Sequence, residues 1–242
     1  MAFPRIAVLV NACAPYFQST VPPLLASLHG AGVRDCDVYV VVGECEEEHD
    51  AEMNIEEINY RVHAYFVGHA NIDNNALIWA VGPQGKEVLK EYDWVFMMHD
   101  TTMALPEFGT LLPRVLTDLR EDETKETASC IQLIWEYSMS MGFYRVKCLN
   151  SIADEILATK STDFSDKARL ALKHIVEDQV FKMLLAKFGR KTWFFIKRKC
   201  DGVANVESPY GGAHRIRETF AIPGIYKFKA NYTNQSPMHV QL

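Results

Sequence analysis

The sequence predicts an α/β fold with a mainly parallel central sheet flanked by helices. In the first half of the chain, short apolar and β-branched runs alternate with segments of helical spacing, as in chains built from βαβ units. The first run, residues 5–10, is almost continuously apolar, which is typical of a parallel strand covered on both faces. With 242 residues, of which 48% are hydrophobic, the chain can form one substantial core. We therefore expect a single domain.

The same patterns predict the order of the elements. Residues 5–10 form the first strand, and residues 16–29 form a helix that two glycines end. The β-branched run at 37–43 is the second strand, and residues 44–50 form an acidic cap or loop. The later elements are a strand at 60–67, a helix from 75 to 81 that resumes through 86–91 after Gly82-Pro83, and a strand at 94–98.

Charge and cysteine usage narrow the class of protein. The formal net charge of −6 argues against nucleic acid or an anionic membrane as a partner, because such surfaces attract basic faces. No apolar stretch reaches the roughly 20 residues of a transmembrane helix, and residues 1–15 lack the layout of a signal peptide. The 6 cysteines include no C-x-x-C pair, so neither a zinc ribbon nor a disulfide framework is predicted. We expect a cytoplasmic protein.

Polar residues follow three of the predicted strands. Asn11-Ala12 follows the first strand, Glu44 the second, and the run from His99 to Thr102 the strand at 94–98. In open parallel sheets, ligands bind outside the carboxyl ends of the strands, so these residues are candidates for a binding site. The chain contains neither G-x-G-x-x-G after the first strand nor G-x-x-x-x-G-K-[ST], which leaves the usual dinucleotide fold and the P-loop unsupported.

Five segments carry a resemblance to a known family. They are the first apolar strand, the second strand with its acidic end, Asp73-Asn74-Asn75-Ala76 at a helix start, Met98-His99-Asp100-Thr101-Thr102, and Val176-Glu177-Asp178 followed by Phe188-Gly189. Residues 139–145 add a segment like the acceptor side of that family. In order and spacing, the chain resembles the GT-A glycosyltransferases of the family 2 type over residues 5 to 200.

This resemblance implies a single GT-A-like, Rossmann-like domain over residues 1–242. Residues 5–110 would form its nucleotide-sugar-binding half, residues 111–200 its acceptor-side half, and residues 201–242 an irregular C-terminal segment. The implied activity is transfer of a sugar from a nucleotide-sugar donor to a glycan or another hydroxyl acceptor. An inverting reaction is expected, and the fold also serves retaining enzymes.

The resemblance also implies roles for the donor-binding residues. Asn11, Ala12 and Glu44 would line the nucleoside pocket. Asn75, at the predicted helix start, and Thr102, after the fourth strand, would also contribute to donor binding.

Metal binding and catalysis fall on other residues. Asp100 would hold Mn²⁺ or Mg²⁺ against the donor diphosphate, and Asp178 would act as general base. The family motif has two carboxylates where this chain has one, so His214, in a glycine-rich loop, is a candidate second metal ligand, with His239 as its rival.

Simpler explanations exist for the same residues. Asp100 can cap a turn, Asn75 can simply start a helix, and Glu177-Asp178 can be acids that the dipole of a helix start stabilises. The alternatives in function are a catalytically degenerate domain that binds a nucleotide sugar or glycan without turnover, and a structural or interaction module. A nucleotidyltransferase of similar topology is a lesser alternative, because no glycine-rich phosphate loop follows the first strand.

Overall fold

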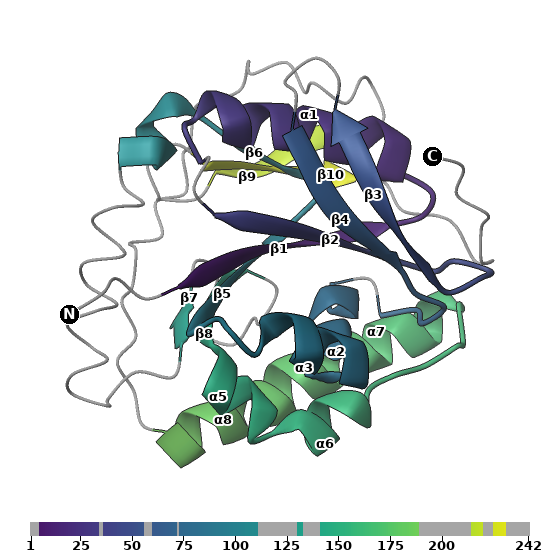
Figure 1. Cartoon of the computed structure of the whole chain (residues 1–242). Coiled ribbons are helices and arrows are strands. Elements are labelled where there is room, and N and C mark those ends of the chain that lie inside the picture. Colours follow the sequence, from purple (N-terminus) through teal and green to yellow (C-terminus); the bar gives the residue numbers. More distant parts are fainter. Residues whose placement is uncertain are drawn as a thin grey trace.

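The computed structural model of the chain describes residues 5–33, 36–55, 60–71, 73–110, 130–132, 141–188, 214–219 and 225–230. Its centre is a 7-stranded sheet with the strand order β3-β4-β2-β1-β5-β8-β7 (Figure 1). The strands are β1 (Ile6–Cys13), β2 (Asp37–Gly43), β3 (His49–Ile55), β4 (Tyr60–Phe66), β5 (Trp94–His99), β7 (Cys130–Gln132) and β8 (Gly142–Arg145).

The four central strands run parallel to one another. β1 pairs in parallel with both β2 and β5, and β4 pairs in parallel with β2. β3 joins β4 antiparallel at one edge, and β8 and β7 join in antiparallel pairs at the other. The predicted α/β class is thus confirmed, with a sheet that is mixed but parallel at its centre.

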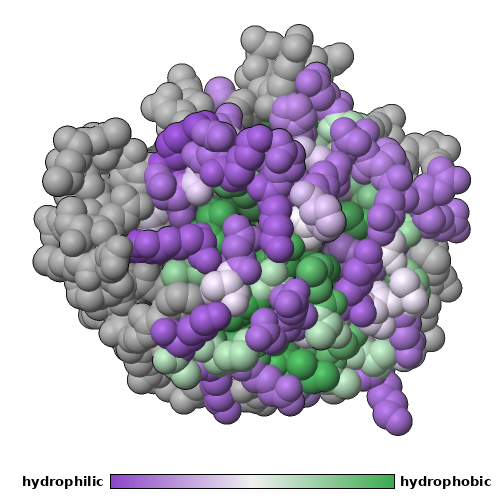
Figure 2. All heavy atoms as spheres, turned by 60° about the horizontal axis from the view of Figure 1, so that its bottom comes forward, coloured by the Kyte–Doolittle hydropathy of each residue, from purple (hydrophilic) through white to green (hydrophobic). Residues whose placement is uncertain are grey.

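Helices cover one face of the sheet, and a smaller group of helical and strand elements covers the other (Figure 1). The first group consists of α2 (Asn75–Val81), α3 (Pro83–Leu89), α5 (Val146–Asn150), α6 (Ala153–Leu157), α7 (Asp166–Ile175), the π-helical turn η2 (Val176–Val180) and α8 (Phe181–Phe188). The second group is α1 (Phe17–Gly30) with the 3-stranded sheet β6-β10-β9, made of β6 (Thr102–Ala104), β10 (Ile225–Ala230) and β9 (His214–Thr219). Viewed from the helical side, hydrophilic side chains surround smaller apolar areas (Figure 2).

The alternation along β1 explains why two layers form. Val8 and Val10 pack into the core that includes α1, whereas Ala7 and Leu9 pack into the core that includes α2. Successive side chains of a strand point to opposite faces, so both faces of β1 must be apolar to be covered. Asn11 continues the α2 side of this pattern, which places an amide at the start of α2.

Three elements differ from the prediction. Strand β3 includes the end of the segment expected to be an acidic loop, and it pairs with β4 along seven residues from His49 to Ile55. β9 and β10 lie in the segment that we expected to be irregular. The break at Gly82-Pro83 is confirmed, because α2 ends at Val81 and Pro83 begins α3.

Candidate functional site

The sheet order changes direction at β1, and such a switch point is where a ligand site is expected. From β1 the chain first adds β2 and β4 on one side, and it later adds β5 on the other. Ligands of open α/β sheets bind at such a switch point, outside the carboxyl ends of the strands. Here Asn11 of β1 is the register partner of His99 of β5, and the backbone N–H of Asp100 donates to the Asn11 carbonyl over 2.9 Å. Two of the predicted strand ends therefore meet.

Asp100 is held by a residue that the sequence did not indicate. Its side-chain Oδ2 accepts a hydrogen bond from the Thr20 hydroxyl over 2.8 Å, and both residues are buried. The same hydroxyl lies 2.9 Å from the Tyr16 carbonyl, but its one proton serves one acceptor at a time, and a charged carboxylate is the stronger one. Thr20 lies in the first turn of α1, where the loop after β1 brings it to the end of β5.

The turn that follows β5 fixes Thr102. The Thr102 hydroxyl donates to the His99 carbonyl, which closes the turn before β6 begins. The buried His99 ring also faces Asp73, with 3.8 Å between Nδ1 and Oδ1. Because the hydroxyl proton of Thr102 points to the backbone, its oxygen can enter any further hydrogen bond only as an acceptor.

Asn11 and Asn75 fix the start of α2. The Asn11 Oδ1 accepts from the backbone N–H of Ala76 over 2.8 Å, so it satisfies one of the N–H groups that a helix start leaves unpaired. The Asn75 Oδ1 accepts from the backbone N–H of Asn71 over 2.8 Å. A Cβ atom on Gly43 would lie 1.7 Å from Asn75 Nδ2, so the glycine lets this amide pack against the end of β2.

A polar segment, His69 to Asn75, lies beside these groups, and its His69, Asn71, Asn74 and Asn75 are buried. Burial lowers the pKa of His69 to about 4, so its ring is neutral near neutral pH. The ring Nε2 lies 3.1 Å from the Asn75 carbonyl and must carry the proton, which leaves Nδ1 as an acceptor. His69 Nδ1, Asn71 Nδ2, Asn74 Oδ1 and Asn75 Nδ2 are buried with no hydrogen-bond partner among the described residues. The three asparagines between positions 71 and 75 could have indicated this segment.

Glu44 differs in burial from the other glutamates of the acidic segment 44–50. Its side chain is fully buried, whereas Glu46, Glu47 and Glu48 are exposed. Its backbone has φ of 69°, in the left-handed region that non-glycine residues rarely adopt and that clusters at functional sites. The Glu44 N–H donates to the His69 carbonyl over 3.1 Å, which ties the end of β2 to the polar segment. Burial raises the pKa of the neighbouring Cys45 thiol to about 12, so this thiol is neutral.

Strand register places His214, the second predicted metal ligand, farther from the end of β5 than Thr102. Thr102 pairs with Lys227 of β10, whereas His214 of β9 pairs with Ala230. Three residues along a strand correspond to about 10 Å, and β10 lies between β6 and β9. Within the described residues, no group of three or more His, Cys, Asp or Glu side chains is arranged to hold a metal ion. His239 lies outside the described residues.

The prediction that Glu177-Asp178 opens a helix is wrong. Both residues lie in η2, which continues directly from α7 and leads directly into α8. The dipole of a helix start therefore does not act on these acids. A π-helical turn inside an α-helix is rare and is often found at functional sites, so the segment remains a candidate on different grounds.

Comparisons with known proteins give no functional assignment for this chain. No protein-family model matches the sequence, and no curated protein matches it. None of the helices in the described part of the chain has the length and apolarity needed to cross a lipid bilayer.

Ala12, the remaining predicted site residue, is buried in β1 opposite Val42 of β2, where its backbone is close to the switch point.

Proposed function

We propose that the protein is a GT-A-like glycosyltransferase that moves a sugar from a nucleotide-sugar donor to a hydroxyl acceptor. The observation that carries the proposal is the buried Asp100 carboxylate at the switch point between β1 and β5, held by Thr20. The buried Glu44 and the polar segment from His69 to Asn75 lie at the ends of the neighbouring strands β2 and β4. This edge supplies many polar groups and a carboxylate, as a polar donor such as a nucleoside diphosphate sugar requires.

In this proposal, Asp100 binds the divalent cation and the cation binds the diphosphate. Mg²⁺ and Mn²⁺ are held by oxygen ligands, and Mg²⁺ in phosphate-transfer sites often uses one or two carboxylates together with substrate oxygens and water. A single carboxylate therefore fits the role. The bound cation would stabilise negative charge on the departing diphosphate. Glu44 would contact the nucleoside, with Asn11, Ala12, Asn75 and Thr102 shaping the donor pocket.

Asp178 is the proposed general base. In an inverting transfer, the acceptor oxygen forms a bond to the anomeric carbon while the bond from that carbon to the diphosphate oxygen breaks. The acceptor hydroxyl gives its proton to the carboxylate during attack. Two facts support this assignment: the position of Glu177-Asp178 in the order of the family-like segments, and their place in a π-helical turn.

Metal-dependent binding tests the role of Asp100. Calorimetric titration of nucleoside diphosphates should give tighter binding in Mn²⁺ than in EDTA for the wild type. Asp100→Ala should lose the metal-dependent part of the affinity, whereas Asp154→Ala, which removes an exposed carboxylate from α6, should keep it. Equal affinity in Mn²⁺ and EDTA for the wild-type protein would contradict the proposal.

Turnover tests the role of Asp178. Asp178→Asn removes the proton acceptor but keeps the size of the side chain, so transfer should fall by about two to four orders of magnitude while donor affinity survives. Glu177→Gln is the matched control and should retain most of the activity. Near-normal transfer by Asp178→Asn would remove this residue from the mechanism.

A second candidate is a domain that binds a nucleotide sugar without turning it over. The observation in its favour is that Asp100 is the only carboxylate in the turn that follows β5 and that Thr20 already donates to it. This candidate predicts metal-dependent donor binding together with no transfer, and no donor hydrolysis, for any acceptor. An interaction module without a ligand predicts no nucleoside diphosphate binding in either condition.

A further inference from the structure

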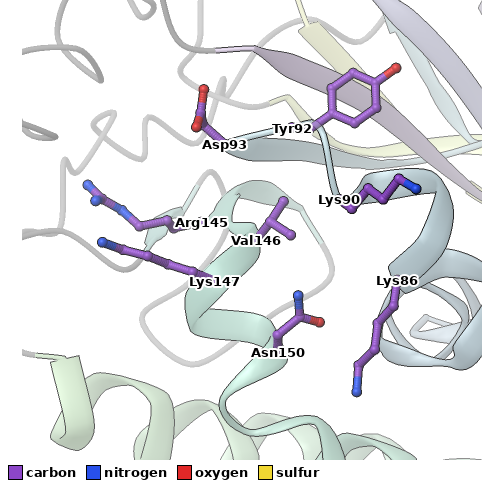
Figure 3. Close-up of a pocket in the computed structure, with 8 residues that line it drawn as sticks. All are labelled: Lys86, Lys90, Tyr92, Asp93, Arg145, Val146, Lys147 and Asn150. Atoms are coloured by element: carbon purple, nitrogen blue, oxygen red, sulfur yellow. The ribbon is translucent and has the colours of Figure 1, made fainter.

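A pocket lies at the end of the sheet opposite the candidate donor site, beside the start of β5 (Figure 3). It has a volume of about 450 Å³, within the range of small-molecule sites. It is formed where β5 begins and β8 ends, between α3 and α5. The residues that line it are Lys86, Lys90, Tyr92, Asp93, Arg145, Val146, Lys147 and Asn150.

Arg145 is the central observation. Its side chain is 5% exposed, and its guanidinium carbon lies 4.8 Å from the centre of the Trp94 ring. The two residues are cross-strand partners in the β5–β8 pair, which explains the stacking. Stacking uses the face of the guanidinium and leaves the N–H groups at its edge. Arg145 Nε and Nη2 have no hydrogen-bond partner among the described residues.

An unpaired buried cation is costly, so a partner for these N–H groups is expected. Buried charges in proteins are almost always paired, because removal from water costs several kcal/mol that an opposite charge must offset. The nearby lining carboxylate belongs to Asp93, and its Oδ2 accepts from the backbone N–H of Arg5 over 2.8 Å. Among the described residues no hydrogen-bond partner neutralises these groups of Arg145, so its charge favours an anion in the pocket that it lines.

Three lysines also line the pocket. Lys147 extends beside Arg145 in the same direction, whereas the side chains of Lys86, in α3, and Lys90, just after it, point away from these two (Figure 3). All three lysines are exposed, and Lys90 is paired with Glu87. The lining thus carries an excess of positive charge on a chain whose net charge is −6. A concentration of basic side chains against the overall charge indicates an anionic ligand.

We propose that this pocket binds a small molecule that carries phosphate groups, with Arg145 and Lys147 contacting the phosphate oxygens. Guanidinium N–H groups match the geometry of phosphate oxygens, and the cations spread over two elements suit a ligand with more than one negative charge. The proposal is independent of the glycosyltransferase assignment. The pocket lies at the start of β5 and the donor site at its end, and six residues of strand separate them by about 17 Å.

Calorimetric titrations with pyrophosphate, inorganic phosphate and citrate test the proposal. They are made in EDTA, so that a metal-dependent donor site does not contribute. Pyrophosphate should bind more tightly than inorganic phosphate and more tightly than citrate, which carries carboxylates only. Lys147→Gln and Arg145→Gln should each weaken pyrophosphate binding by about tenfold, because each removes a charge-assisted hydrogen bond. Lys167→Gln, which removes an exposed charge from α7, should bind as the wild type does.

Other results would overturn the proposal. They are absence of pyrophosphate binding at millimolar concentration, equal binding of citrate, or loss of binding in Asp100→Ala, which would place the anion at the donor site. If Arg145→Gln does not fold, Lys147→Gln and Lys86→Gln decide the question, because both side chains are exposed. Wild-type affinity in both of these lysine variants would also reject the site.

Discussion

At the scale of single residues, the hydrogen bond from Thr20 to Asp100 should be measurable as stability. Thr20→Val keeps the shape of the side chain but removes the hydroxyl that donates to Asp100 Oδ2. A buried carboxylate that loses such a bond costs about 1–3 kcal/mol. Urea unfolding should therefore show Thr20→Val to be destabilised by this amount.

A double-mutant cycle isolates the pair. In an Asp100→Ala background the hydroxyl no longer has a carboxylate to bind, so Thr20→Val should cost much less there than in the wild type. Thr20→Ser, which keeps the hydroxyl, should preserve the coupling. Equal costs in the two backgrounds would show that Thr20 acts through the Tyr16 carbonyl instead.

The lowered pKa of His69 predicts how the stability of the protein depends on pH. Desolvation lowers its pKa from 6.5 to about 4 in the folded protein. Between these two values the unfolded chain binds the proton more readily, so the contribution of His69 is full above pH 6.5 and declines as the pH falls toward 4. From pH 7 to pH 5 this loss amounts to about 2 kcal/mol.

The measurement compares unfolding free energies at the two pH values. His69→Gln removes the titrating ring, so its loss of stability from pH 7 to pH 5 should be smaller than that of the wild type by about 2 kcal/mol. His63→Gln, which replaces an exposed histidine of β4, should follow the wild type. The same pH dependence in His69→Gln as in the wild type would show that His69 is not the group responsible.

At the scale of elements, contact between β2 and α2 depends on Gly43. In Gly43→Ala the new Cβ would lie 1.7 Å from Asn75 Nδ2 and 2.3 Å from Asn75 Cγ, so the amide must move. Its Oδ1 would then lose the bond from the Asn71 N–H. Overpacking of this kind costs about 1–3 kcal/mol, and thermal or urea unfolding should detect it.

Two further variants separate the clash from a general effect of alanine. Gly30→Ala adds a Cβ that meets no atom within 4 Å, so it should not destabilise the protein. Asn75→Ala removes the clashing amide, so Gly43→Ala should cost less in that background than in the wild type. Equal destabilisation by Gly30→Ala and Gly43→Ala would contradict the packing argument.

Hydrophobic pattern predicted the central strands and missed the peripheral ones. β1, β2, β4 and β5 are apolar enough to be recognised from residue order alone. β3, with the sequence HDAEMNI, has few β-branched residues, because an edge strand needs fewer buried side chains than a central one. β6 has three residues and forms only with partners more than 100 positions away in the chain. Such pairing leaves no local signal.

At the scale of the whole molecule, topology determined which site residues the sequence could indicate. Asn11, Glu44 and Asp100 were expected at one edge because each follows a strand of a parallel sheet, and the strand pairings place their backbones there. Thr20 was missed because its contact with Asp100 spans 80 residues and depends on how α1 packs. The interruption of the helix at Val176–Val180 was missed because local spacing does not distinguish a π-helical turn from an α-helix.

The two edges of the sheet should respond to different ligands. With a nucleoside diphosphate and Mn²⁺, amide hydrogen exchange should slow at Asn11–Cys13, at residues 69–75 and at His99–Thr102, because a ligand at the switch point touches these three segments. Exchange at Val146–Asn150, beside the basic pocket, should be the same in Mn²⁺ and in EDTA, because phosphate binding there needs no metal. Pyrophosphate in EDTA should give the opposite pattern, with protection at Arg145–Asn150 alone. Asp100→Ala should lose the first response and keep the second. Mn²⁺-dependent protection confined to Val146–Asn150 would show that the donor binds in the basic pocket, and it would contradict the donor site at the switch point.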